Sequence, residues 1–317
     1  MFLNNDSGYV DGKAVMSLRV SVIIPAYNSA RTIERALRSV VEQTLQPHEI
    51  ILVDDGSSDD TVALVRRTFP SVIIIAQANA GASAARNRGV AEATGELIAF
   101  LDSDDAWHLQ KLQMQVGVFE RSPQLNFLST QCEYFTEQKW LAEQPLKLAH
   151  FDRVDIKELD FYQVFAHPFL ATPSVMMRKA FFDSLAGFDQ ALETAEDVDL
   201  WLRAAYHGRY ALVSAPLTIV IAQEESLSTR TLHSPYGQHL VVLERFCRGK
   251  QFSWTFWCWI LPKTKSDIYC KWGSTLLVIQ RPVEAWYKLT RSLLCMPTAR
   301  GFFLWLKALL QILAPKT

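Results

Sequence analysis

Hydrophobic residues along the chain fall into short continuous runs, separated by segments with helical spacing. The runs cover residues 20–24, 50–53, 72–75 and 96–101, and they are rich in β-branched side chains. Such runs are typical of parallel strands buried on both faces. Between the first two runs, residues 33–41 place apolar side chains on one helical face. This alternation over short links predicts an α/β fold with a Rossmann-like, mainly parallel sheet flanked by helices.

Acidic side chains follow two of these runs, where each strand should end. Asp54 and Asp55 follow the second run, and Asp102, Asp104 and Asp105 follow the fourth. Ligands of such sheets bind outside the carboxyl ends of the strands, so both groups should face one crevice. Like charges this close raise each other's pKa and repel unless a cation lies between them. Because carboxylates favour Mg²⁺ or Mn²⁺ over zinc, the sequence predicts a site for a divalent cation.

Local structure offers another explanation for each acidic group. One acid of residues 102–105 could cap a helix that begins near Trp107, although a cap needs one acid and not three. Asp54 or Asp55 could form a turn with Gly56.

The second half of the chain has a weaker pattern. Residues 127–167 are expected to form loops or an insertion, and a last strand is expected at 210–213. Between them, Glu196 and Asp197 lie at an acid-rich helix start. Thr194 and Asp197 also fit an N-terminal capping arrangement, which is compatible with a chemical role for the adjacent acids.

The residues after about His239 differ in composition, with tryptophan interleaved with lysine and arginine. A short apolar helix is expected from 301 to 314. These features fit a packed helical subdomain, and they also fit an amphipathic surface that touches lipid headgroups. The predicted organisation is a poorly ordered extension at 1–17, a main domain at 18–238 and a helical extension at 239–317.

Composition narrows the class of protein. The 317 residues hold 32 Lys or Arg and 33 Asp or Glu, so the net charge of −1 gives no basic field for nucleic acid. Five cysteines without a Cys-x-x-Cys pair fit a reducing, intracellular compartment. No signal peptide is recognisable, and no apolar run reaches the ~18 residues of a membrane span. We expect a cytoplasmic protein, peripheral to the inner face of the cell membrane if the tail binds lipid.

Four motifs, in this order, resemble those of the family 2 glycosyltransferases. They are Val20–Asn28, Ile51–Ser57, Phe100–Asp105 and the pair Glu196-Asp197. The resemblance covers most of the chain up to about residue 230, and four motifs in order are specific where one alone would be weak. It implies a GT-A fold and an inverting enzyme that moves one sugar from a nucleotide-diphosphate donor to an acceptor hydroxyl.

The resemblance also implies nucleotide-binding residues. Pro25 and Tyr27 would line the site, with Tyr27 stacked on the base, although a tyrosine here could instead pack against the strand edge. Asp55 would accept a hydrogen bond from the base imide, which favours a UDP- or TDP-sugar. Arg86, in a Gly-x-x-x-Ala-Arg-Asn motif, would reach the nucleotide, and Asp102 would bind the ribose.

The remaining assignments concern the cation and the chemistry. Asp104 is the expected ligand of Mg²⁺ or Mn²⁺, with Asp102 or Asp105 assisting, and the cation would stabilise the departing diphosphate. Asp197 is the expected general base for the acceptor hydroxyl, with Glu196 orienting it or lining the site.

Family members often carry a histidine shortly before a Ser-x-Ser segment. Here Gln223 stands in that place before Ser226-Leu227-Ser228, with His233 further on as a substitute. The acceptor is expected to be a glycan or a lipid-linked intermediate of cell-surface polysaccharide synthesis. A nucleotidyltransferase and a non-catalytic nucleotide-sugar binding protein remain the alternatives.

Overall fold

The fold is taken from a computed structural model, which describes residues 18–143, 154–168, 170–222 and 235–313. The predicted extension at 1–17 lies outside the described residues, as do Gln223, Ser226, Ser228 and His233. The chain divides into two compact units, which are Met1–Asp160 with Phe169–Ser226 and Phe161–Pro168 with Leu227–Thr317. The predicted division at residue 238 stays a prediction.

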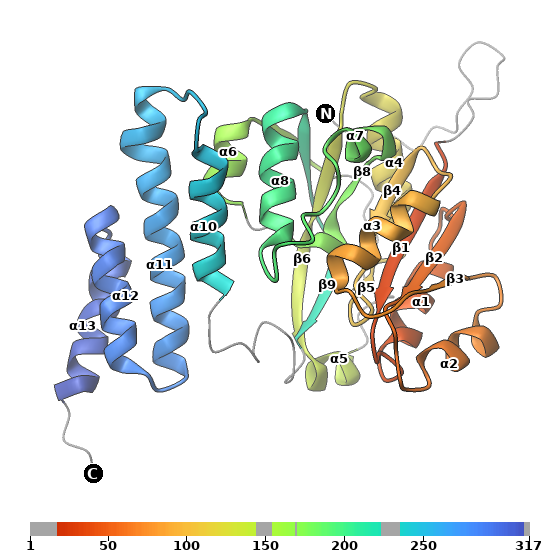
Figure 1. The fold of residues 1–317 in the computed structure, drawn as a ribbon, viewed down its shortest axis with the longest axis horizontal. Coiled ribbons are helices and arrows are strands. Elements are labelled where there is room, and N and C mark those ends of the chain that lie inside the picture. Colours follow the sequence, from red (N-terminus) through yellow and green to blue (C-terminus); the bar gives the residue numbers. More distant parts are fainter. Residues whose placement is uncertain (1–17, 144–153, 169, 223–234, 314–317) are drawn as a thin grey trace. The chain divides into compact units, whose positions relative to one another are not determined.

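The first unit is built on one sheet. Its strands are β1 Val20–Ala26, β2 Glu49–Asp54, β3 Ile73–Ala76, β4 Leu97–Phe100, β5 Ala106–Trp107, β6 Phe127–Thr136, β7 Ile156–Leu159, β8 Met176–Arg178 and β9 Tyr210–Ala222. Over the described ranges they form a nine-stranded sheet in the order β3-β2-β1-β4-β8-β6-β9-β5, with β7 also paired to β9 (Figure 1). Strands β1 to β4 pair in parallel.

The second half of the sheet is mixed. Strand β8 is antiparallel to both β4 and β6, so β6 runs in the same direction as β4. Strand β9 is parallel to β6, whereas β5 and β7 are antiparallel to β9. The carboxyl end of β6 therefore points to the same edge of the sheet as the carboxyl ends of β1, β2 and β4.

Helices cover both faces of this sheet (Figure 1). In the first unit they are α1 Ile33–Val41, α2 Thr61–Thr68, α3 Ala82–Glu92, α4 Lys111–Arg121, α5 Glu137–Glu143, α7 Lys179–Ser184, α8 Glu196–His207 and the 3₁₀ turn η2 Thr172–Ser174. The predicted α/β fold is confirmed.

Alternating side chains of β4 build the two core layers. Leu97 and Ala99 join the core that also contains the buried residues of α1 and α4. Phe100 points to the other face, where its ring lies 5.5 Å from that of Phe188 and 6.4 Å from that of Trp201. On this face α3 lies close to the sheet, because a Cβ at Gly89 would lie 2.6 Å from a methyl group of Ile23.

Two parts of the chain differ from what the sequence indicated. Residues 127–167 are not mainly loops, since they contain β6, α5, β7 and the helix α6 Phe161–Ala166. Strand β6 escaped notice because only its first four residues are buried in succession, and the rest of it follows no regular alternation. The helix after Trp107 begins at Lys111, because Ala106 and Trp107 form β5, so none of the acids after β4 caps it.

The second unit is helical. Besides α6 it holds α10 Pro235–Cys247, the π-helical turn η3 Phe256–Ile260, α11 Leu261–Val278, α12 Pro282–Cys295 and α13 Ala299–Leu313. Its small core joins α11, α12 and α13 through residues such as Leu277, Leu289 and Ala308. Within the described part of the chain, no helix is long and apolar enough to cross a membrane.

Candidate active site

The carboxyl ends of β1, β2 and β4 bring three sequence motifs together. Past β1, the backbone N–H of Asn28 donates to Ser57 Oγ, which follows β2, over 2.9 Å. Ser29 Oγ lies 2.8 Å from Ser103 Oγ, which sits between the acids that follow β4. Hydrogen bonds across strand ends therefore hold the three loops in one place, as the sequence predicted for a shared crevice.

Asp55 is fixed by three donors. Its Oδ1 accepts from Gln77 Nε2 at 2.7 Å and from the backbone N–H of Ala80 at 2.9 Å, and its Oδ2 accepts from the N–H of Gly81 at 2.8 Å. A carboxylate offers about four acceptor positions, so Oδ2 keeps one for a further donor. The neighbouring acid, Asp54, forms the turn, because its Oδ1 accepts the N–H of Ser57.

The two other predicted residues of this region differ in exposure. Tyr27 follows β1 with 52% of its surface exposed, so its ring is available to a flat partner. Pro25 is buried within β1, paired in register with Val53.

Arg86 connects the acids after β4 with the acids at the start of α8. Its Nη2 donates to Asp102 Oδ1 at 2.7 Å, and its Nη1 donates to Glu196 Oε1 at 3.1 Å. Burial opposes the charge of the guanidinium, but Asp102 and Glu196 outweigh it and raise the pKa of Arg86 above its ordinary value. Arg86 therefore stays charged and joins the end of β4 to the start of α8.

The acids after β4 repel one another. Burial and the charge of Asp102 raise the pKa of Asp104 to about 6. Burial together with both neighbouring acids raises the pKa of Asp105 well above its usual range. The Asp105 carboxylate faces the sheet, where its Oδ1 accepts the N–H of Ile221 in β9 at 2.9 Å. Arg35 donates to the backbone carbonyl of Asp104 and fixes the loop.

The acids after β4 fit a hard cation by their donor chemistry. No group of three or more Asp, Glu, His or Cys side chains within the described ranges is arranged to hold a metal by itself. Mg²⁺ is usually bound by one or two carboxylates together with substrate phosphates, and it does not need an all-protein cage. Asp104, with its carboxyl pKa raised by burial and by Asp102, offers such a ligand, since a cation would relieve the repulsion.

Asp197 lies at the first turn of α8, beside Glu196. Burial and the Glu196 charge raise the pKa of Asp197 to about 7, although the N–H of Val198 and the charge of Arg86 act in the opposite direction. The capping arrangement proposed for Thr194 does not form, because Ala195 precedes the helix at φ 64° and no side chain caps it. The carboxyl group is thus poised to exchange a proton near neutral pH.

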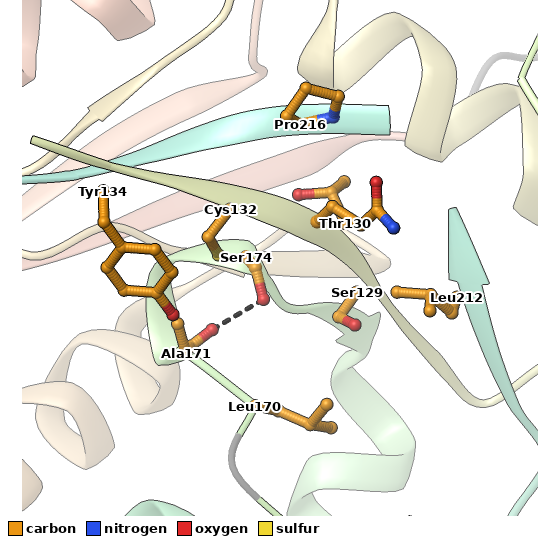
Figure 2. A pocket seen from close by; sticks show the side chains of 10 residues that line it. Ser129, Thr130, Cys132, Tyr134, Leu170, Ala171, Ser174, Leu212 and Pro216 are labelled. Carbon is orange, nitrogen blue, oxygen red and sulfur yellow. Dashed lines mark hydrogen bonds between the residues drawn. The ribbon is translucent and has the colours of Figure 1, made fainter. Parts of the chain in front are cut away.

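A cavity of about 350 Å³ lies beside β6. Figure 2 shows the side chains of Ser129, Cys132 and Tyr134 on one side of this strand, facing the segment 170–174. Shifts in register between Thr130 and Cys132 put these side chains on the same side despite their odd spacing. Sequence reasoning missed this cavity, since nothing in residues 127–167 indicated a strand with a bulge.

Comparison with known proteins identifies the family. The model of glycosyl transferase family 2 matches residues 21–185, which is more than half of the chain. The chain belongs to glycosyl transferase family 2. The matched range includes the strands and loops that carry Tyr27, Asp55, Arg86 and the acids after β4, so the predicted family and the predicted glycosyltransferase class are confirmed.

Individual relatives agree with this assignment. The chain is 28% identical to an uncharacterized glycosyltransferase of Haemophilus influenzae over 221 residues, which are 68% of this chain and 73% of that protein. It is also 28% identical to the amylovoran biosynthesis glycosyltransferase AmsB of Erwinia amylovora over 208 residues, 62% of this chain and 67% of AmsB.

Solved structures support the fold. The crystal structure of S. aureus TarS 1–349 matches with a TM-score of 0.63 at 18% identity, over 88% of this chain and 81% of that one. A structure of the same TarS fragment with UDP-GlcNAc matches with a TM-score of 0.60 at 17% identity, over 90% of this chain and 91% of that one. The predicted GT-A fold with C-terminal helices is therefore confirmed for this family 2 member.

We expect Arg86→Met to destabilise the protein by about 2–3 kcal/mol, because the carboxylates of Asp102 and Glu196 lose the guanidinium that bonds to both. The ~3–5 kcal/mol typical of fully buried pairs is an upper limit, because Asp102 and Glu196 are 27% and 19% exposed. The matched control is Arg88→Met, two residues further along α3. Arg88 pairs with Glu92 at the surface, and its loss should cost less than ~0.5 kcal/mol. Urea unfolding measures both, and equal losses would contradict the bridging role.

Proposed function

We propose that this family 2 glycosyltransferase is an inverting enzyme that moves one hexose from a nucleotide-diphosphate donor to an acceptor hydroxyl. The observation that carries the proposal is the Asp197 carboxyl, whose pKa is raised to about 7. It lies at the same site as the acids after β4, because Arg86 bonds to both Asp102 and Glu196. Arg86 thus links a neighbour of the proposed base to a neighbour of Asp104, the proposed ligand of the cation.

The donor would occupy the crevice at the ends of β1, β2 and β4. The exposed ring of Tyr27 offers a stacking surface for a base. The acceptor position that remains on Asp55 Oδ2 suits the imide N–H of uracil or thymine, whereas the ring nitrogen N3 of cytosine is itself an acceptor. The UDP-GlcNAc complex of TarS supports a uridine donor by analogy of fold.

A divalent cation would be held by Asp104, with Asp102 or Asp105 assisting. When bound, Mg²⁺ or Mn²⁺ supplies charge stabilisation for the diphosphate leaving group. Asp102 also remains the proposed partner of the ribose, and Arg86 a proposed contact of the nucleotide.

Asp197 would act on the acceptor. Its ionised carboxylate takes the proton of the attacking hydroxyl while the bond between the anomeric carbon and the diphosphate breaks on the opposite side of the sugar. Glu196 is held by Arg86, and its interaction with Asp197 helps to raise the pKa of Asp197. Inversion follows because attack and departure occur on opposite faces in a single displacement.

The acceptor would be a glycan or lipid-linked intermediate of cell-surface polysaccharide synthesis. AmsB, a relative that matches over most of its length, is named for amylovoran biosynthesis. A nucleotidyltransferase and a non-catalytic binding protein are both disfavoured by the family assignment.

Charge distribution supports a peripheral membrane location on the cytoplasmic side. Residues 235–313 contain 11 Lys or Arg and 3 Asp or Glu, whereas residues 18–222 contain 18 and 26. The helical region therefore carries a net charge of +8 in a chain whose overall charge is −1. A basic surface of this kind is attracted to anionic lipid headgroups. All five cysteines are free, which fits a reducing compartment.

Helix α13 supplies the apolar part of such a surface. One face packs on the core of the helical unit through Ala308 and its neighbours. The opposite face exposes five large apolar side chains at helical spacing, which are Phe302, Phe303, Leu306, Leu310 and Leu313. An exposed apolar stripe on a basic unit is typical of helices that lie in the membrane interface.

The donor assignment predicts selective thermal stabilisation. UDP or TDP with Mn²⁺ should raise the melting temperature, since a ligand at a hundredfold excess over its Kd stabilises by about 2.7 kcal/mol. Asp55→Ala should abolish the stabilisation. The control variant Asp60→Ala should keep it, because Asp60 is an exposed residue directly before α2. Stabilisation by GDP alone would refute the assignment of the base.

The base assignment predicts a pH dependence. Because only the ionised carboxylate accepts a proton, kcat should fall as the pH drops through about 7, the pKa of Asp197. Asp197→Asn should lower kcat by about 10²–10⁴-fold and leave nucleotide affinity unchanged. Asp104→Asn is the contrasting variant, since it should weaken cation-dependent donor binding as well. Transfer at the wild-type rate by Asp197→Asn would move the base to Glu196.

The membrane proposal predicts binding to vesicles. The full chain should float with phosphatidylglycerol vesicles at low salt and dissociate at high salt, because the attraction is electrostatic. Phe303→Ser with Leu310→Ser should reduce flotation strongly. The control is Ile73→Ser on the edge strand β3, a similarly exposed apolar residue outside the helical unit. Unchanged flotation of the double variant would rule out α13 as the lipid-binding helix.

A further inference from the structure

The cavity beside β6 is lined by uncharged groups. None of its lining residues is Asp, Glu, Lys, Arg or His. The two lining groups that could ionise stay protonated at neutral pH. Burial and the charge of Asp105 raise the pKa of Cys132 to about 11, and a tyrosine phenol such as that of Tyr134 ordinarily ionises only near pH 10. A phosphate or carboxylate ligand would find no countercharge here, so the lining favours a neutral ligand.

The lining combines apolar and hydroxyl-bearing side chains. The apolar part of the wall is formed by Leu170, Leu212 and Pro216. Ser129 and Ser174 add hydroxyl groups. Both hydroxyls already have a protein partner and keep acceptor capacity for a ligand. The volume of about 350 Å³ falls within the ~300–1,000 Å³ of small-molecule sites. A pyranose ring has the matching surface, since it carries C–H groups on its faces and hydroxyls around its edge.

Tyr134 gives the cavity a stacking surface. It lies on the carboxyl-terminal half of β6, and 71% of its surface is exposed. Figure 2 shows its ring at the cavity, close to Ala171. An exposed aromatic ring presents a rigid apolar face at small entropic cost.

Both sides of the cavity are bonded to the proposed catalytic elements. Strand β9, which carries Leu212 and Pro216, donates the N–H of Ile221 to Asp105. On the other side, Trp201 Nε1 in α8 donates to the carbonyl of Leu170 at 3.2 Å. Helix α8 begins at Glu196 and Asp197, so the cavity wall at Leu170 is bonded to the helix that carries the proposed base.

A buried polar network keeps the cavity wall in place. Trp107 Nε1 donates to the carbonyl of Pro173 at 2.8 Å, and Gln115 Nε2 donates to the carbonyl of Ser174 at 2.9 Å. Lys111 Nζ in turn donates to Gln115 Oε1 at 2.7 Å. Burial lowers the pKa of Lys111, whose Nζ also lies 4.0 Å from the centre of the Trp107 ring. The wall is therefore preformed, which reduces the cost of binding.

From these observations we propose that the cavity beside β6 binds an uncharged pyranose unit of the acceptor, with Tyr134 stacked on one face of the ring. The inference rests on the proposed glycosyl transfer and adds the chemical class of the acceptor at this position. The sugar would be held on the side of α8, so that a hydroxyl of the acceptor can approach Asp197. Charged groups of the acceptor would lie elsewhere.

Saturation-transfer NMR on the full chain tests this binding without requiring catalysis. The probes are methyl pyranosides of glucose, galactose, mannose and N-acetylglucosamine, with glycerol phosphate as the anionic comparison. At least one pyranoside should receive saturation, and glycerol phosphate should not compete with it. Tyr134→Ala should raise the dissociation constant about twofold to tenfold, the loss expected for one aromatic contact. Leu212→Trp, which fills the cavity, should abolish binding.

The control is Tyr206→Ala, which removes an exposed tyrosine of α8 outside the cavity and should leave pyranoside binding unchanged. A second readout is the release of UDP from a UDP-sugar in water, which needs the donor site and no acceptor sugar. Tyr134→Ala should keep this rate.

Three results would overturn the inference. The first is that the wild-type protein binds no pyranoside, and the second is that binding survives both Tyr134→Ala and Leu212→Trp. The third is that Tyr134→Ala lowers UDP release together with pyranoside binding, which would assign the cavity to the donor. A wild-type protein that releases no UDP from any UDP-sugar would instead count against the proposed function, whatever the pyranosides do.

Discussion

The confinement of several carboxylates at one edge of the sheet is the constraint on which this site depends. Asp102 and Glu196 are far apart in the sequence, and Arg86 bridges them with bonds of 2.7 and 3.1 Å. The guanidinium comes from α3, which lies against the sheet so closely that only a glycine fits at residue 89. Ordinary packing of α3 on the sheet thus positions the Arg86 guanidinium. Its positive charge allows acids from two distant segments to lie close together.

Arg86 neutralises only part of the negative charge at this edge of the sheet. The remaining charge affects the pKa values of two buried carboxyl groups. Asp104 and Asp197 keep pKa values raised to about 6 and about 7, because each is buried next to another acid. One is suited to a metal that would relieve the repulsion, and the other to accepting a proton. The same electrostatic cost would therefore serve two proposed roles, the binding of a cation at Asp104 and the transfer of a proton at Asp197.

Sequence could predict the parallel half of the sheet and the acids at its edge. Runs such as 50–53 and 96–101 are apolar throughout because both faces of β2 and β4 are buried, and acids directly after them must lie at the carboxyl edge. Arg86 was predicted to face the nucleotide. Its bonds to Asp102 and Glu196 were not foreseen, since they depend on how α3 and α8 pack against the sheet.

The cavity beside β6 could not be predicted from the sequence for a related reason. Strand β6 changes from buried to exposed midway, and its register shifts near Gln131, so its pattern matches neither a buried strand nor an alternating one. The bulge nevertheless decides which side chains share a face. Ser129 and Cys132 both line the cavity, and the register shifts lie between them.

Charge also bears on the two proposals that concern parts of the chain outside the donor site. The cavity beside β6 offers no countercharge to an anionic group, whereas a neutral sugar needs none. Residues 18–222, with a net charge of −8, would be repelled by an anionic membrane. The +8 of residues 235–313 would offset that repulsion, so the proposed acidic chemistry and the proposed attraction to lipid would reside in different parts of the chain.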